Sequence, residues 1–147
     1  MIMRSVVQIG IILFLVIGAY IAGYRLTNPS TCGAFCTTHI QSIQAKEFKR
    51  LVTQDGYTII DVRTPEEFQD GHIEKAINAD IQDSSQFDTF LTSLDVTKKY
   101  LIYCRSGNRS GQALERMKQK GFTNVTDLSG GIVSWQKEGF TLAKTTN

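Results

Sequence analysis

The sequence predicts an α/β fold in which a parallel sheet carries helices on both faces, preceded by one transmembrane helix at the N-terminus. Strand patterns alternate with helical spacing from Ile43 onward, as in α/β proteins. The run KYLIYC at 99–104 is apolar on both faces and bounded by polar residues, which is typical of a buried strand in a parallel sheet. An uncharged run near the N-terminus supplies the transmembrane helix.

That run, SVVQIGIILFLVIGAYIAGY at 5–24, lies between Arg4 and Arg25. Its length suits a helix that crosses the bilayer core, which takes about 20 residues. A cleaved signal peptide is the alternative, but its apolar core usually has only about 7–15 residues. We predict an anchor or signal segment over 1–24 and favour the anchor. Because Arg4 and the free amine outnumber Arg25, charge favours an extracytoplasmic domain, periplasmic if the source is bacterial.

Residues 25–42 have mixed polar composition and are predicted to form a linker, followed by the α/β domain over 43–147. The linker contains Cys32 and Cys36. These could form a local disulfide in an oxidising compartment, or they could be two unconnected thiols. Only His39 stands near them as a further ligand, so we predict no metal site.

Within the domain, each element follows from its residue pattern. Thr64 is placed to cap a helix whose first residue is Pro65, and Gly121 stands where a helix would end. Phe87, Phe90 and their neighbours fall at helical spacing. The predicted helices are 45–52, 64–69, 84–94, 109–120 and 132–139, and the predicted strands are 57–62, 76–80, 99–104 and one within 122–131.

The candidate site is the loop that follows the strand at 99–104. Cys104 ends that strand, and the polar sequence RSGNR leads into a helix. Backbone N–H groups of such a loop, two arginines and the helix dipole would lower the pKa of the thiol. A lone cysteine is otherwise a small buried hydrophobe, which the basic loop disfavours. We predict Cys104 as the nucleophile, and the residues that bind a small anionic substrate as Arg105, Ser106, Gly107, Asn108 and Arg109.

Three segments together resemble single-domain rhodaneses: IIDVRTPEEFQDGHIEKAINADI at 59–81, YCRSGNRS at 103–110 and LSGGIVSWQKEGF at 128–140. The resemblance implies a sulfurtransferase without a cofactor, in which a persulfide forms on Cys104. Sulfur would pass from thiosulfate or a similar anion to cyanide or a thiol. The family commonly has Pro-Gly after GHI, where this chain has Glu74 and Lys75, so the shape of that turn is in question.

Two other functions stay open. Cysteine phosphatases and arsenate reductases of the related fold have five residues between cysteine and arginine, whereas four separate Cys104 from Arg109. A domain that binds partners or carries sulfur would share the same fold. We assign structural roles to Asp61, Arg63 and His72. The net charge of +2 gives no basic field that would indicate nucleic-acid binding.

Overall fold

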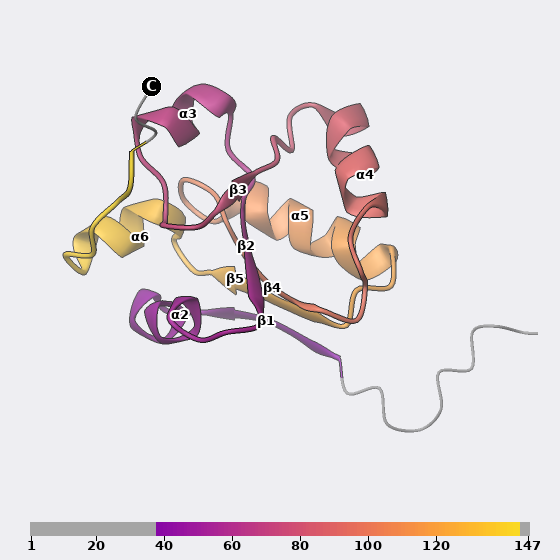
Figure 1. Cartoon of the computed structure of the whole chain (residues 1–147), viewed down its shortest axis with the longest axis horizontal. Coiled ribbons are helices and arrows are strands. Elements are labelled where there is room, and N and C mark those ends of the chain that lie inside the picture. Colours follow the sequence, from indigo (N-terminus) through magenta and orange to yellow (C-terminus); the bar gives the residue numbers. More distant parts are fainter. Residues whose placement is uncertain (1–37, 145–147) are drawn as a thin grey trace, which may run out of the picture. The chain divides into compact units, whose positions relative to one another are not determined.

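The computed structural model describes residues 38–144 of the 147-residue chain (Figure 1). The predicted anchor or signal segment over 1–24 lies outside the described residues, as do Cys32, Cys36 and most of the predicted linker. Across residues 38–144, none of the helices combines the length and the apolar character needed to cross a membrane.

Five parallel strands form the sheet, in the order β1-β5-β4-β2-β3. Their buried positions carry mostly isoleucine, leucine, valine and tyrosine, which suits strands covered on both faces. The strands are β1 (His39–Ile43), β2 (Tyr57–Asp61), β3 (Ile77–Asn78), β4 (Lys99–Tyr103) and β5 (Asn124–Leu128). The predicted parallel sheet is confirmed.

Helices cover both faces of this sheet, as the sequence predicts (Figure 1). Successive side chains of a strand point to opposite faces, so β4 contributes to two apolar layers. Ile102 packs with α4 and α5, and Leu101 packs with α2 and α6. The helices are α2 (Ala45–Val52), α3 (Pro65–Asp70), α4 (Ser84–Thr92), α5 (Asn108–Gln119) and α6 (Gly131–Lys137).

The strand β1 was not predicted, because all of it except Ile43 falls in the segment 25–42 that was assigned to a linker. Its sequence HIQSI is mostly polar, and its side chains are exposed or half-buried. An edge strand is held by backbone hydrogen bonds along one side, so it needs little apolar surface. It pairs in parallel with β5, with Ser42 opposite Asp127. The sheet therefore begins at His39, before the predicted domain start at Ile43.

The short helix α3 begins as predicted. Thr64 accepts a hydrogen bond from the Glu67 amide, and the Glu67 side chain accepts one from the Thr64 amide, which completes a capping box around Pro65. His72, just after α3, stacks on the Phe68 ring, and its Nδ1 lies 3.0 Å from the Phe68 carbonyl oxygen. These contacts agree with the structural role assigned to His72.

Candidate active site

Cys104 follows the last residue of the central strand β4, at the carboxyl edge of the sheet. In parallel α/β sheets this edge is where ligands bind. The residue is only 1% exposed and joins the apolar layer beneath α5. The chain turns at Gly107 and then begins α5, so the thiol lies close to the N-terminus of that helix.

Two groups donate hydrogen bonds to the Cys104 sulfur. The Gly107 amide nitrogen is 3.1 Å from Sγ and the Ser110 hydroxyl oxygen is 3.4 Å from it. Gly107 has φ 99°, a left-handed conformation that residues with a β-carbon rarely adopt, and it is the N-cap residue of α5. Ser110 is not among the residues predicted from the sequence, although its place in the first turn of α5 could have indicated it.

The helix α6 fixes the backbone of this loop. The Ile132 amide donates to the Cys104 carbonyl at 2.8 Å, and the Val133 amide donates to the Arg105 carbonyl at 3.2 Å. Gly131 lies against the same two peptide groups, because a β-carbon built on it would be 2.5 Å from the Cys104 oxygen. A glycine at this position therefore lets α6 approach the loop closely.

The two arginines of the loop differ in their surroundings. Arg105 is exposed and has no ion pair within residues 38–144. Arg109 forms a two-point ion pair with Glu67 of α3, with its Nη1 and Nη2 atoms 2.6 and 2.8 Å from the carboxylate oxygens. The hydrogen bond from Arg109 lowers the pKa of Glu67 and raises the pKa of Arg109. This pairing was not predicted from the sequence.

Ser106 and Asn108 are exposed. The Asn108 side chain accepts a hydrogen bond from Gln112 on the surface of α5, at 2.9 Å. Neither side chain hydrogen-bonds the Cys104 sulfur, which accepts from the Gly107 amide and the Ser110 hydroxyl.

Asp61, the last residue of β2, forms a buried ion pair with Arg63. Arg63 Nη2 is 2.6 Å from the Asp61 carboxylate and 2.8 Å from the Gly71 carbonyl oxygen. Asp61 is 0% exposed and Arg63 is 5% exposed. Burial opposes the charge on Arg63, but the hydrogen bonds and the charge of Asp61 outweigh it and raise the pKa of Arg63. The structural role predicted for this pair agrees with these contacts.

Residues 44–138 match the family model described as the rhodanese-like domain. The chain belongs to the rhodanese-like family. A rhodanese-related protein from Thermoplasma volcanium has a similar structure, with a TM-score of 0.63 and 35% identity over 71% of this chain and 99% of that one.

Proteins with several different names are similar to part of this chain. A sulfurtransferase from Allochromatium vinosum is 32% identical over 62% of this chain and 82% of its own length. Thiosulfate sulfurtransferase 16 from Arabidopsis thaliana is 36% identical over 57% of this chain and 78% of its own length. An uncharacterized protein from Synechocystis is 32% identical over 72% of this chain, which spans 58% of that protein. The chain spans only 32% of a tRNA uridine(34) hydroxylase from Pelagibacter ubique.

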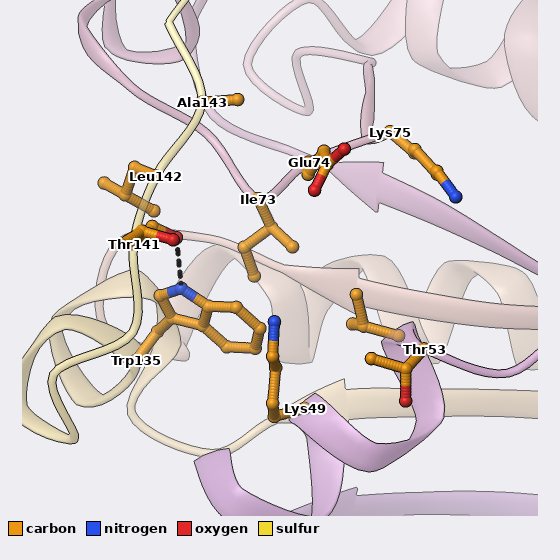
Figure 2. Close-up of a pocket in the computed structure, with 10 residues that line it drawn as sticks. Lys49, Thr53, Ile73, Glu74, Lys75, Trp135, Thr141, Leu142 and Ala143 are labelled. Carbon is orange, nitrogen blue, oxygen red and sulfur yellow. Dashed lines mark hydrogen bonds between the residues drawn. The ribbon is translucent and has the colours of Figure 1, made fainter.

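The rhodanese-like domain also has a cavity of about 370 Å³ away from the cysteine loop (Figure 2). It lies between α2, α6 and the C-terminal segment, and Figure 2 shows the Trp135 indole donating to the Thr141 carbonyl oxygen. Lys49 is held over the Trp135 ring, 5.3 Å from its centroid. None of the residues from Cys104 to Arg109 lines this cavity.

Proposed function

We propose that this domain transfers a sulfane sulfur from thiosulfate, or a related small anionic donor, to a thiol or cyanide acceptor. The observation that carries the proposal is the hydrogen bond that the Cys104 sulfur accepts from the Gly107 amide, at the start of α5. A thiolate gains from such a donor and from the positive end of a helix dipole. Membership of the rhodanese-like family and the relatives named as sulfurtransferases support the same activity.

The reaction has two half-reactions. The Cys104 thiolate attacks the outer sulfur of thiosulfate, and the bond from that sulfur to sulfite breaks with its electron pair leaving on sulfite. A persulfide anion remains on Cys104. The acceptor then attacks the terminal sulfur and restores the thiolate, so no oxidant or cofactor is consumed. Covalent catalysis of this kind gives ping-pong kinetics.

The arginines have different roles in this proposal. Arg105 is exposed and free to attract the anionic donor. Glu67 orients the Arg109 guanidinium. The positive charge of Arg109, partly offset by Glu67, stabilises the negative charge that develops around the sulfur. Amides of the loop, with Gly107 already directed at Sγ, would hold the terminal sulfur of the persulfide.

The test is sulfur transfer from thiosulfate to cyanide by the full chain, with mass spectrometry to detect one added sulfur atom on Cys104. We expect transfer by the wild type and none by Cys104→Ser. Arg105→Ala is the matched comparison, since it removes an exposed charge and leaves the fold intact. It should raise KM for thiosulfate several-fold with little change in kcat. A full-chain enzyme with reduced Cys104 and no transfer would refute thiosulfate as the donor.

One observation favours a second candidate, a sulfur-carrier or binding module. Both Nη atoms of Arg109 donate hydrogen bonds to Glu67, so Arg109 has fewer donors left to bind a free anion. A carrier would take sulfur from a protein persulfide and show no turnover with thiosulfate. A phosphatase substrate serves as the remaining control. We expect no hydrolysis of it, because four residues separate Cys104 from Arg109, whereas cysteine phosphatases of the related fold have five.

We propose further that residues 1–24 anchor the protein in a membrane with the domain on the extracytoplasmic side. The uncharged run between Arg4 and Arg25 supports this. Alkaline extraction of membranes should leave the protein in the pellet, and an impermeant thiol reagent should label Cys36 in intact cells. Labelling only after permeabilisation would reverse the orientation, and release by alkali would exclude the anchor.

A further inference from the structure

Ser110 has a buried hydroxyl that the proposed chemistry does not yet use. The residue belongs to the first turn of α5 and is 0% exposed. Its hydroxyl oxygen lies 3.4 Å from Cys104 Sγ and 3.3 Å from the Gly107 carbonyl oxygen. A hydroxyl has one proton to donate. The Ser110 proton can therefore go to the sulfur or to this carbonyl, but not to both at once.

The charge on Sγ decides which of the two acceptors takes this proton. Hydrogen bonds to ionised groups are roughly twice as strong as those between neutral groups. While Cys104 is a thiolate, the Ser110 hydroxyl therefore donates to Sγ, beside the Gly107 amide nitrogen at 3.1 Å. A neutral sulfur is a weak acceptor, so the Gly107 carbonyl oxygen takes the proton when Sγ carries no charge.

The two half-reactions change the charge on Sγ in opposite directions. When the persulfide forms, Sγ gives its electron pair to the new S–S bond, and the negative charge ends on the terminal sulfur. When the acceptor attacks the terminal sulfur, the S–S bond breaks and its electron pair returns to Sγ. A donor that stabilises charge on Sγ alone therefore opposes the loading of sulfur and assists its discharge.

We propose that Ser110 is a catalytic residue of the second half-reaction, in which its hydroxyl stabilises the Cys104 thiolate as the leaving group. In the persulfide the hydroxyl donates to the Gly107 carbonyl oxygen, and it needs only to rotate to meet the charge that returns to Sγ. Loss of this hydroxyl stabilises the persulfide relative to the thiolate. This role rests on the proposed function of Cys104 as the nucleophile.

Burial makes this hydroxyl hard to replace and directs it at the inner sulfur. Cys104 is 1% exposed and lies in the apolar layer with Ala113 and Met117 of α5. Water therefore has little access to Sγ and cannot easily take the place of a lost donor. An acceptor must reach the terminal sulfur from solvent, so that sulfur extends away from the buried Ser110 side chain.

The first measurement is the equilibrium between thiolate and persulfide in the full chain, set by mixtures of thiosulfate and sulfite. Iodoacetamide traps both forms, and mass spectrometry of the Cys104 peptide gives their ratio without interference from Cys32 and Cys36. The pH is one at which alkylation of Cys104 has reached its plateau, so that each variant starts as the thiolate. Ser110→Ala should reach half-conversion at a thiosulfate-to-sulfite ratio about tenfold below that of the wild type, as for one weak hydrogen bond to a charged group.

The second measurement is the rate of each half-reaction in single-turnover experiments. The charge on a sulfur changes only about halfway in such transition states, so the tenfold effect divides between the two rates. Ser110→Ala should discharge its persulfide to cyanide about threefold more slowly and load from thiosulfate about threefold faster. Ser134→Ala is the matched control, because that hydroxyl oxygen lies 2.7 and 2.8 Å from the carbonyl oxygens of Ser129 and Gly131. A purely structural loss there should slow both half-reactions alike or neither.

Two results would overturn the role of Ser110: an equilibrium that coincides with the wild type, or a shift toward the thiolate, which would put the hydroxyl on the terminal sulfur. Alanine has the highest helix propensity, so the variant should fold, and Ser110→Gly lacks the same hydroxyl if it does not. If the wild type takes no sulfur from thiosulfate, the proposed donor is wrong. Both proteins are then loaded with inorganic polysulfide, and equal rates of discharge to cyanide would exclude Ser110 by themselves.

Discussion

Replacing Gly131 by alanine should displace the cysteine loop. Gly131 has φ 58°, and a β-carbon there would lie 2.5 Å from the Cys104 oxygen and from the Arg105 carbonyl carbon. Ordinary contacts begin at 3.4 Å, so the overlap is about 0.9 Å. The obstructing atoms are backbone, and their carbonyl groups already accept from Ile132 and Val133. The loop and α6 must therefore separate.

The magnitude follows from two terms. A left-handed conformation costs an alanine about 1 kcal/mol, and overpacking against rigid neighbours adds about 1–3 kcal/mol. We expect Gly131→Ala to lower the free energy of unfolding by about 2–4 kcal/mol. A displacement of the nucleophile approaching 1 Å should also reduce sulfur transfer by about 100-fold.

Two other glycines separate these terms. Gly121 has φ 89° and open space around its missing β-carbon, so Gly121→Ala should lose only about 1 kcal/mol. Gly111 lies inside α5 with open space and no positive φ, so Gly111→Ala should gain about 0.5–1 kcal/mol. Urea unfolding and thiosulfate-to-cyanide transfer would be measured for all three variants. Equal losses for Gly131→Ala and Gly121→Ala, with full activity in both, would refute the argument from close approach.

Three further predictions concern stability. Lys75 has φ 64°, so Lys75→Gly should raise the free energy of unfolding by roughly 0.5–1 kcal/mol, and a lower urea midpoint would contradict this. Because Arg109 lowers the pKa of Glu67, the pair stabilises the fold above the unfolded pKa of about 4.3, and this stabilisation is lost as pH falls through the lower folded value. Glu67→Gln should lose about 1 kcal/mol at pH 7 and nothing at about pH 2; an equal loss at both would exclude the ion pair as the cause. Asp61→Asn leaves Arg63 charged in a buried site, so the free energy of unfolding measured by thermal unfolding should fall by about 3–5 kcal/mol. A fall of less than about 1 kcal/mol would show that water compensates the charge of Arg63.

The central elements could be predicted because their residues have strong local patterns. The capping signals at Thr64 and Pro65 predicted the start of α3, and the apolar run before Cys104 predicted the buried strand β4. The position of Cys104 at a helix N-terminus followed from this order of elements. By contrast, β1 is polar and depends on backbone pairing with β5, which its own sequence does not reveal.

The largest part of the site that was missed depends on a contact between distant segments. The Arg109 ion pair joins residues 42 positions apart, and the residue pattern around either partner does not reveal the other. The turn at Glu74 and Lys75, where the family commonly has Pro-Gly, is made with Lys75 itself in the left-handed region. No propensity of lysine predicts that conformation, so the surrounding fold must impose it.

The parallel pairing of β1 with β5 also determines on which side of the domain a support can be attached through the N-terminal chain. Because all five strands run in one direction, His39 lies beside Asn124 at the amino edge of the sheet, and the cysteine loop leaves from the carboxyl edge. A five-residue strand spans about 17 Å. A bead, fusion partner or other support joined to the chain just before His39 would meet the domain on the side opposite Cys104. Attachment there should leave the cysteine loop unobstructed for donors and acceptors as large as a folded protein.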